Sequence, residues 1–200
     1  MLIMNRYIIY LLFLPILSIA QNFNAGPIIG FNTSQVSGDN LSGFNKIGVR
    51  CGGFVSYNLK KIDIQIELQY INKGSRKAIQ ENTYNEGYRF AVNYIEIPLL
   101  IKKSIYKKTM IETGFQVGSL LNWEETCDGI DCSGLEVKKV EYSIIIGFSR
   151  MITNRLYLNS RLCNSIIPIR EHFLGQTQNI NSKGQYNTSI SFAISYDLAN

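Results

Sequence analysis

The chain has 200 residues, of which 46% are apolar and 18% charged, and a formal net charge of +5. This apolar content excludes an intrinsically disordered chain, and the scattered basic residues form no stripe for binding nucleic acid. Abundant Tyr, Phe and Gly with few charges favour a single all-β domain over a helical one.

The first twenty residues predict a secretory signal peptide. Arg6 precedes the apolar run YIIYLLFLPILSIA, which closes on the small residues Ser18 and Ala20. A basic start, an apolar centre and small residues two apart are the three parts of such a signal. Pro15 and the short length of the run argue against a membrane-spanning helix. We therefore expect cleavage after Ala20, export, and a mature domain over residues 21–200.

Export permits disulfide bonds, so the cysteines matter. Cys127 and Cys132 lie in the polar, turn-rich stretch ETCDGIDCSG, where a disulfide can close a short loop. The alternative is half of a metal site, but no second Cys or His pair stands nearby. We predict a disulfide between Cys127 and Cys132, and unpaired thiols at Cys51 and Cys163, which lie in strand-like segments.

Eight segments after residue 24 alternate apolar and polar side chains with a period of two, which predicts amphipathic β-strands. The pattern is clearest over residues 62–69, IDIQIELQ. Such strands suit either a soluble barrel with an apolar interior or a membrane barrel with an apolar exterior. The segments cover residues 25–34, 46–59, 62–74, 89–105, 109–123, 137–152, 156–165 and 185–197.

The connections between these segments alternate in length. Long connections follow the first, third, fifth and seventh segments, whereas the others are as short as Lys60-Lys61. Transmembrane barrels have long extracellular loops at one end and short periplasmic turns at the other. The expected fold is therefore all-β: an eight-stranded antiparallel up-and-down transmembrane β-barrel in the outer membrane. The alternative is a soluble exported lipocalin-like barrel that binds an apolar ligand.

Three stretches, GFNTSQVSGDN, ELQYINKGSRK and YIEIPLLIKK, together resemble the PorT-like outer-membrane β-barrel family of Bacteroidetes bacteria. The resemblance extends from about residue 23 to the end of the chain. It implies an eight-stranded outer-membrane barrel of unassigned biochemical activity, and it brings no catalytic motif. Some members of that family are linked to protein secretion, so a secretion accessory component or a narrow pore is a further alternative.

The barrel hypothesis directs a set of charged side chains into the lumen. They are Arg50, Asp63, Glu67, Glu96, Lys102, Glu112 and Arg161. An isolated charge in a narrow lumen is very costly, so we expect ion pairs that fill the barrel and serve its structure. The alternative is acid–base chemistry by Glu67 and Glu96, which lie on neighbouring strands. Glycines on the same face, including Gly48 and Gly52, would leave room for these side chains.

Two further expectations concern single strands. Pro98 removes one ladder hydrogen bond from the strand that holds it, so we predict a bulge or a local break there. Aromatic residues near strand ends are expected to form girdles at the membrane interfaces. They are Tyr57, Tyr70, Trp123, Tyr142 and Tyr196.

No pattern in the sequence predicts catalysis. His172, the one histidine, lies in the last long loop without the motif of an activated nucleophile. We therefore expect no enzyme activity, no cofactor and no bound metal. The expected partners are outer-membrane lipid and a protein or surface ligand at the extracellular loops, with Arg76, Lys77, Trp123 and His172 as candidate contacts. We expect a monomer that does not bind nucleic acid.

Overall fold

The computed structural model describes residues 23–39, 41, 43–77, 87–171 and 184–198. The predicted signal peptide and His172 lie outside the described residues. Within the described part of the chain, no helix is long and apolar enough to cross a membrane. The strands in this part are β1 (Phe23–Ser37), β2 (Lys46–Leu59), β3 (Ile62–Lys77), β4 (Tyr88–Tyr106), β5 (Thr109–Cys127), β6 (Ile130–Asp131), β7 (Val140–Met151), β8 (Leu156–Ser165) and β9 (Tyr186–Tyr196).

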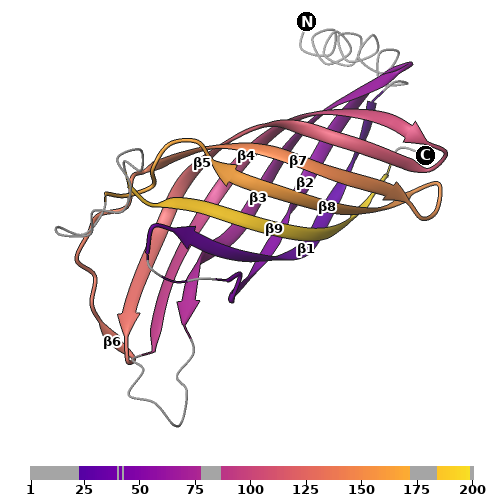
Figure 1. Ribbon diagram of the computed structural model, residues 1–200. Helices are drawn as coiled ribbons and strands as arrows, with labels where there is room; N and C mark the ends of the chain where they lie inside the picture. The colour runs from indigo at the N-terminus through magenta and orange to yellow at the C-terminus, as the bar shows by residue number, and fades with distance from the viewer. Residues whose placement is uncertain (1–22, 40, 42, 78–86, 172–183, 199–200) are drawn as a thin grey trace, which may run out of the picture.

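Eight of these strands close into an antiparallel barrel (Figure 1). Each pairs with its neighbour in the chain, β5 pairs with β7, and β9 returns to pair with β1. The two-residue strand β6 only extends the outer end of β5. Phe23 lies opposite Tyr57 and Tyr196 opposite Leu156, so the barrel begins and ends on the side of the short turns. The predicted up-and-down topology is confirmed.

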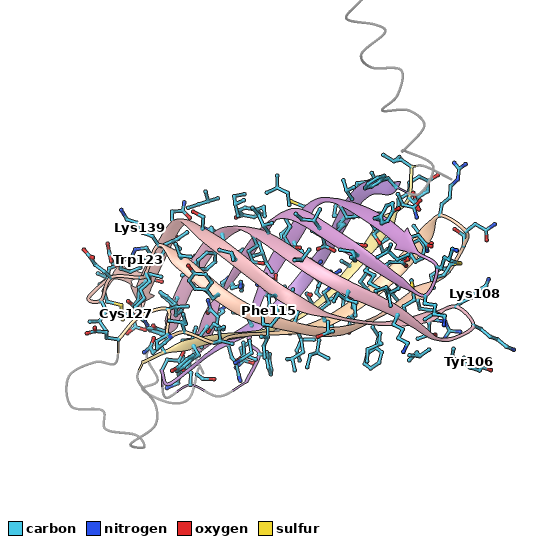
Figure 2. All side chains as sticks on the ribbon, turned by 90° about the horizontal axis from the view of Figure 1, so that it is seen from above. Tyr106, Lys108, Phe115, Trp123, Cys127 and Lys139 are labelled. Atoms are coloured by element: carbon cyan, nitrogen blue, oxygen red, sulfur yellow. A yellow bond between two sulfur atoms is a disulfide. The ribbon has the colours of Figure 1, made fainter. Side chains whose placement is uncertain are left out.

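The barrel is apolar outside and polar inside. Large apolar side chains stand exposed around its wall, and Phe115, labelled in Figure 2, is one of them. Other members of this belt are Ile66, Leu68, Ile97, Leu99, Ile101, Ile146, Leu162 and Ile194. Along the same strands the intervening residues are buried, and most of the charged ones lie among them; Leu100, Ile145 and Ala193 are buried apolar exceptions. A lipocalin-like barrel has the opposite arrangement, so the structure contradicts that alternative, and the belt fits the hydrocarbon of a membrane.

Pairing around Pro98 is broken on one side only. Between β3 and β4 the ladder runs to Leu99 and resumes at Glu96, without a change of register, so the rungs of Ile97 and Pro98 are missing. Between β4 and β5 both residues are paired. The predicted local break is confirmed on the β3 side, whereas the alternative of a bulge at Pro98 is wrong. An apolar groove of about 650 Å³, lined by Leu68 and Ile97 among others, opens at the same place.

The outer part of the wall between β2 and β3 is closed by side chains. Backbone pairing of these strands ends at Arg50 and Ile71. Beyond it, Asn32 Nδ2 of β1 donates to the Asn72 carbonyl at 3.0 Å, and Ser34 Oγ accepts from the Gly74 amide at 3.0 Å. A Cβ atom at Gly48 would collide with the Asn72 carbonyl oxygen. Glycine at position 48 therefore lets β3 approach β1 closely.

Candidate functional site

The centre of the lumen is organised by Arg161 of β8. Its Nη1 and Nη2 atoms each donate to Glu67 of β3 at 2.7 Å, and its Nε donates to Glu112 of β5 at 2.6 Å. All three side chains are buried. One planar guanidinium on β8 thereby joins two carboxylates on β3 and β5, the strands that flank β4, a geometry that lysine cannot reproduce.

Two more cations complete this layer. Arg50 of β2 donates to Glu67 at 3.1 Å and to Gln69 Oε1 at 2.7 Å. Lys102 of β4 lies 3.4 Å from Glu112, on the side of the short turns. The layer therefore satisfies each carboxylate with at least two donors, which offsets the cost of removing the charges from water.

A second layer lies toward the long loops. Gln69 Nε2 donates to Glu96 at 2.9 Å, and Lys73 Nζ lies 2.5 Å from Glu96 and 2.6 Å from Glu141. Asn187 Nδ2 of β9 donates to Glu141 at 2.6 Å. Through Gln69 the two layers form one connected network, which we call the lumen network. Its four cations (Arg50, Lys73, Lys102, Arg161) balance its four carboxylates (Glu67, Glu96, Glu112, Glu141).

The structure places all but one of the predicted lumen residues in this network. Asp63 is the exception, because it lies half-buried at the turn end of β3, where it accepts a hydrogen bond from Asn58 at 2.7 Å. Sequence reasoning missed Lys73 and Glu141. Strand alternation was sufficient to find Lys73, since it has the same parity as Glu67 and Gln69 on β3.

Glu67 and Glu96 do not form a carboxylate pair. Glu67 is bound by two arginines, and Glu96 by Lys73 and Gln69. A general acid or base needs a proton that it can exchange with a substrate, but here each carboxylate is held in fixed ion pairs inside a filled lumen. This arrangement suits a structural role.

An apolar cluster fills the lumen above the lumen network. Its buried members are Val36, Ile71, Phe90, Val92, Tyr94, Val137 and Ile169. Trp123 packs against them, with its ring centre 6.4 Å from that of Phe90. The extra residue Leu121 shifts the β4–β5 register, so that Asn93 faces Asn122 while Tyr94 faces Leu120. This bulge turns Trp123 inward, and the prediction of a girdle position for Trp123 is wrong.

Arg170 ties the extracellular segments together. Its Nη1 and Nη2 atoms donate to Glu125 of β5 at 2.8 and 3.1 Å, and Nη2 donates to the Tyr88 hydroxyl of β4 at 3.0 Å. The guanidinium also lies 4.0 Å above the ring of Phe90. Gln185 pairs with Arg170 through both backbone and side chain. We call this group the extracellular clasp: it fixes the two ends of the last long loop to β4 and β5.

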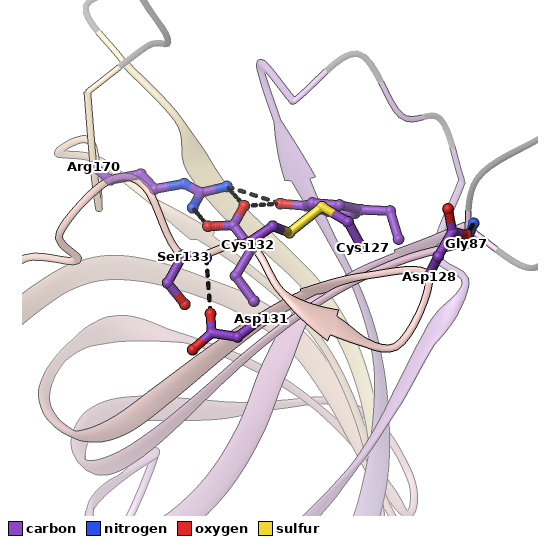
Figure 3. The surroundings of a disulfide bond; sticks show 9 residues. Gly87, Cys127, Asp128, Asp131, Cys132, Ser133 and Arg170 are labelled. Atoms are coloured by element: carbon purple, nitrogen blue, oxygen red, sulfur yellow. Dashed lines mark hydrogen bonds and ion pairs between the residues drawn. A yellow bond between two sulfur atoms is a disulfide. The ribbon is translucent and has the colours of Figure 1, made fainter.

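The predicted disulfide is present beside this clasp (Figure 3). Cys127 and Cys132 are bonded across the β5–β6 turn. Asp128 in the turn accepts from the Gly87 amide at 2.6 Å and donates its own amide to the Gly87 carbonyl at 2.7 Å. The disulfide therefore stabilises the β5–β6 turn, to which Gly87, the residue before β4, is hydrogen-bonded. Cys51 and Cys163 are free thiols, as expected.

Two extracellular carboxyl groups have shifted pKa values. Burial raises the pKa of Asp39, and the hydrogen bond that it accepts from the Leu41 amide opposes the shift. At the exposed tip, hydrogen bonds from Ser133 lower the pKa of Asp131. Asp131 therefore keeps its charge to lower pH than an ordinary aspartate.

The described residues contain no group of three or more His, Cys, Asp or Glu side chains arranged to hold a metal ion. The cavity at the other end of the barrel measures about 270 Å³ and opens between the short turns. Asp63, Lys102, Lys108 and Tyr157 are among the residues that line it. The ion pair of Lys102 with Glu112 lies at its inner end, where the lumen network begins.

Breaking the disulfide should loosen the tip without unfolding the barrel. The Asp128 and Cys132 amides donate to Gly87 and Glu125, and closure of so short a loop is worth only about 2 kcal/mol. We expect the Cys127→Ser/Cys132→Ser variant to exchange these amide hydrogens faster, while the barrel stays folded and its free energy of unfolding falls by no more than about 2 kcal/mol. Hydrogen exchange with mass spectrometry measures the first effect and denaturant titration the second, and unchanged exchange at the tip would show that the disulfide has no bracing role.

Removing Arg170 should release the extracellular clasp. The Arg170→Ala variant leaves the buried Glu125 carboxylate without its guanidinium, which costs about 3 kcal/mol locally. We expect trypsin to cleave after Lys138 and Lys139 at least about tenfold faster on the folded protein. Glu171→Ala is the control, since this exposed neighbour makes no clasp contact. Equal cleavage rates for both variants would contradict the clasp.

Comparisons with known proteins agree with this geometry. A family model described as outer membrane protein beta-barrel domain matches residues 19–171. Among curated proteins, none is significantly similar in sequence. The attachment invasion locus protein Ail of Yersinia pestis, in complex with the heparin analogue sucrose octasulfate, is 9% identical, with a TM-score of 0.51 over 88% of this chain and 99% of Ail.

Neisserial surface protein A is 10% identical, with a TM-score of 0.51 over 88% of this chain and 96% of that protein. The outer membrane protease OmpT of Escherichia coli also matches over 88% of this chain and 97% of its own, but with a TM-score of 0.41. The likeness to Ail and to Neisserial surface protein A shows a shared barrel fold and nothing about activity.

Proposed function

Because the chain belongs to the outer membrane protein beta-barrel domain family, we propose that it is a sealed membrane anchor whose extracellular end binds a partner. The chain is a small eight-stranded outer-membrane barrel. The proposal concerns the use of that barrel: a structural or interaction role through the long loops, without catalysis.

The filled lumen is the observation that carries this proposal. The lumen network spans the barrel with balanced charge, and the apolar cluster stands above it. A transport path would need a continuous aqueous route, and eight strands leave an interior that side chains can just fill. The features that remain available for function are those at the two ends.

The extracellular end favours an interaction surface. There the clasp and the disulfide fix described residues at the ends of the long loops, and fixing these residues before binding lowers the entropic cost of binding. Ail has been captured with a sulfated saccharide analogue, a precedent for ligand binding by a barrel of this fold. We also propose that the chain belongs to the PorT-like outer-membrane β-barrel family of Bacteroidetes bacteria, and that its residues 1–20 are a signal peptide.

Site-specific photocrosslinking in whole cells tests where partners bind. A photoreactive residue at Lys139, at the long-loop end, is compared with one at Lys108, in a short turn; both positions are shown in Figure 2. We expect crosslinked adducts to a protein or surface ligand from position 139 and none from position 108. Both side chains are exposed, so accessibility does not bias the comparison.

The reverse pattern would overturn this function. Adducts from position 108 alone would place the partner in the periplasm, which is the result expected of a secretion accessory component. Adducts from neither position, in cells where the folded barrel is abundant, would contradict an interaction role at these ends.

A further inference from the structure

The cavity at the short-turn end of the barrel is lined by charged residues that lie outside the lumen network. It measures about 270 Å³, and all eight barrel strands contribute to its wall. Its acidic residues are Asp63 of β3 and Asp197, which follows β9, while Lys107 and Lys108 of the β4–β5 turn line its open side. The mouths of β-barrels are common places for small ligands, and the arrangement of these charges indicates which ligand this one fits.

The acidic side of the cavity is centred on the hydroxyl group of Tyr157. This side chain of β8 interacts electrostatically with both Asp63 and Asp197. Asp197 lies beside β8, since its amide donates to the Arg155 carbonyl at 2.8 Å. Asp63 lies on β3, across the barrel from β8. Two carboxylates and a hydroxyl group that line one small cavity match the three N–H donors of a primary ammonium group.

A strip of the cavity wall leads from Tyr157 to the lysines. Met151 of β7 lies opposite Tyr157 in the ladder, and its amide donates to the Lys108 carbonyl at 2.8 Å. These three residues therefore follow one another across β8, β7 and the turn before β5, a span of roughly 10 Å. Met110 also lines the cavity. Because methionine side chains are unbranched and adaptable, this strip suits an aliphatic chain.

We propose that the cavity binds a small molecule with a primary ammonium group at one end and a carboxylate at the other, separated by a short aliphatic chain. Asp63, Asp197 and the Tyr157 hydroxyl hold the ammonium group. Lys107 and Lys108 hold the carboxylate. Both charges of the ligand thereby meet opposite charges, which offsets the cost of removing them from water. The site faces the periplasm, so it goes beyond the extracellular role proposed above and does not depend on it.

Three probes that differ by one charge test this site. 6-Aminohexanoate carries both charges, N-acetyl-6-aminohexanoate lacks the positive charge, and 6-aminohexanamide lacks the negative charge. Each probe is titrated against the folded barrel in lipid nanodiscs, with empty nanodiscs as the background, and saturation-transfer NMR measures its dissociation constant. We expect 6-aminohexanoate to bind about tenfold more tightly than either derivative, the difference that corresponds to about one charge-assisted contact.

Variants then test the residues assigned to each end of the ligand. Asp63→Asn should weaken 6-aminohexanoate binding about tenfold and remove its advantage over the N-acetyl derivative. Tyr157→Phe removes one neutral hydrogen bond and should weaken binding about threefold. Lys108→Gln should reduce the advantage over the amide. Lys61→Gln is its matched control, because it removes a charge from an exposed short turn outside the cavity wall and should change nothing. Heat-modifiable gel mobility confirms that each variant is folded.

Each other outcome would overturn the proposal. No binding by the wild-type protein would show that the cavity is closed to such ligands, which is the result expected if other residues of the chain occupy it. Equal affinity for all three probes would show that only the aliphatic chain is held. Equal weakening by Lys61→Gln and Lys108→Gln would mean general attraction to the basic turns. None of these results would affect the extracellular interaction role, which photocrosslinking from position 139 tests separately.

Discussion

Replacing Arg161 by methionine is expected to lower the free energy of unfolding by about 3–5 kcal/mol. The guanidinium holds the Glu67 and Glu112 carboxylates from the centre of the lumen. Methionine fills a similar volume, but it leaves the two buried carboxylates with only Arg50 and Lys102 as charged partners among the described residues. Denaturant titration of the barrel, reconstituted in lipid vesicles and followed by gel mobility, measures the loss.

Arg155→Met is the matched control for this experiment. Arg155 lies exposed in the turn between β7 and β8, so its loss should change stability by no more than about 0.5 kcal/mol. An Arg161→Met variant as stable as the wild type would show that water or mobile ions, and not Arg161, compensate these carboxylates.

Phe115→Arg should cost about 2–4 kcal/mol, the cost of a basic side chain near the middle of the lipid face of a barrel. Phe115 is 66% exposed and points outward from the centre of β5. In a water-soluble barrel this change would be nearly neutral, because the arginine would be solvated. The same titration in vesicles gives the difference in unfolding free energy between variant and wild type.

The stability cost of an introduced arginine should depend on its depth in the membrane. Tyr106→Arg places the same charge at the short-turn end of β4, at a side chain that is 67% exposed. Its cost should fall to about 0–1 kcal/mol, as expected near an interface. Equal costs at positions 106 and 115 would contradict a lipid belt centred on Phe115.

Strand alternation and loop lengths were sufficient to predict the barrel, because both depend on local sequence. IDIQIELQ shows the two faces of β3 directly, and Lys60-Lys61 is the turn that was expected. The ends of strands were predicted less well: β5 continues to Cys127, four residues beyond the predicted end. Its last residues are polar and pair with β4 above the membrane, where no apolar face is needed to hold a strand.

The candidate site was only partly predictable from the sequence. Parity assigned Glu67, Arg50 and Arg161 to the lumen, but it could not tell which cation meets which carboxylate, because that depends on strand stagger around the closed barrel. The contacts of Arg170 could not be predicted from the sequence, since it lies in an irregular loop and contacts Glu125 only through tertiary structure. The Trp123 side chain points inward because of one bulge, and no turn residue in the sequence predicts that bulge.

The most direct test of the central claim, a barrel sealed by its own side chains, is the current through single reconstituted molecules. Wild-type protein is inserted into a planar lipid bilayer in concentrated potassium chloride, with insertion confirmed by heat-modifiable mobility of the recovered protein. The lumen network and the apolar cluster predict a flat trace at the level of the bare membrane. Reproducible stepwise openings of the wild-type protein would contradict the sealed lumen and the anchoring role inferred from it.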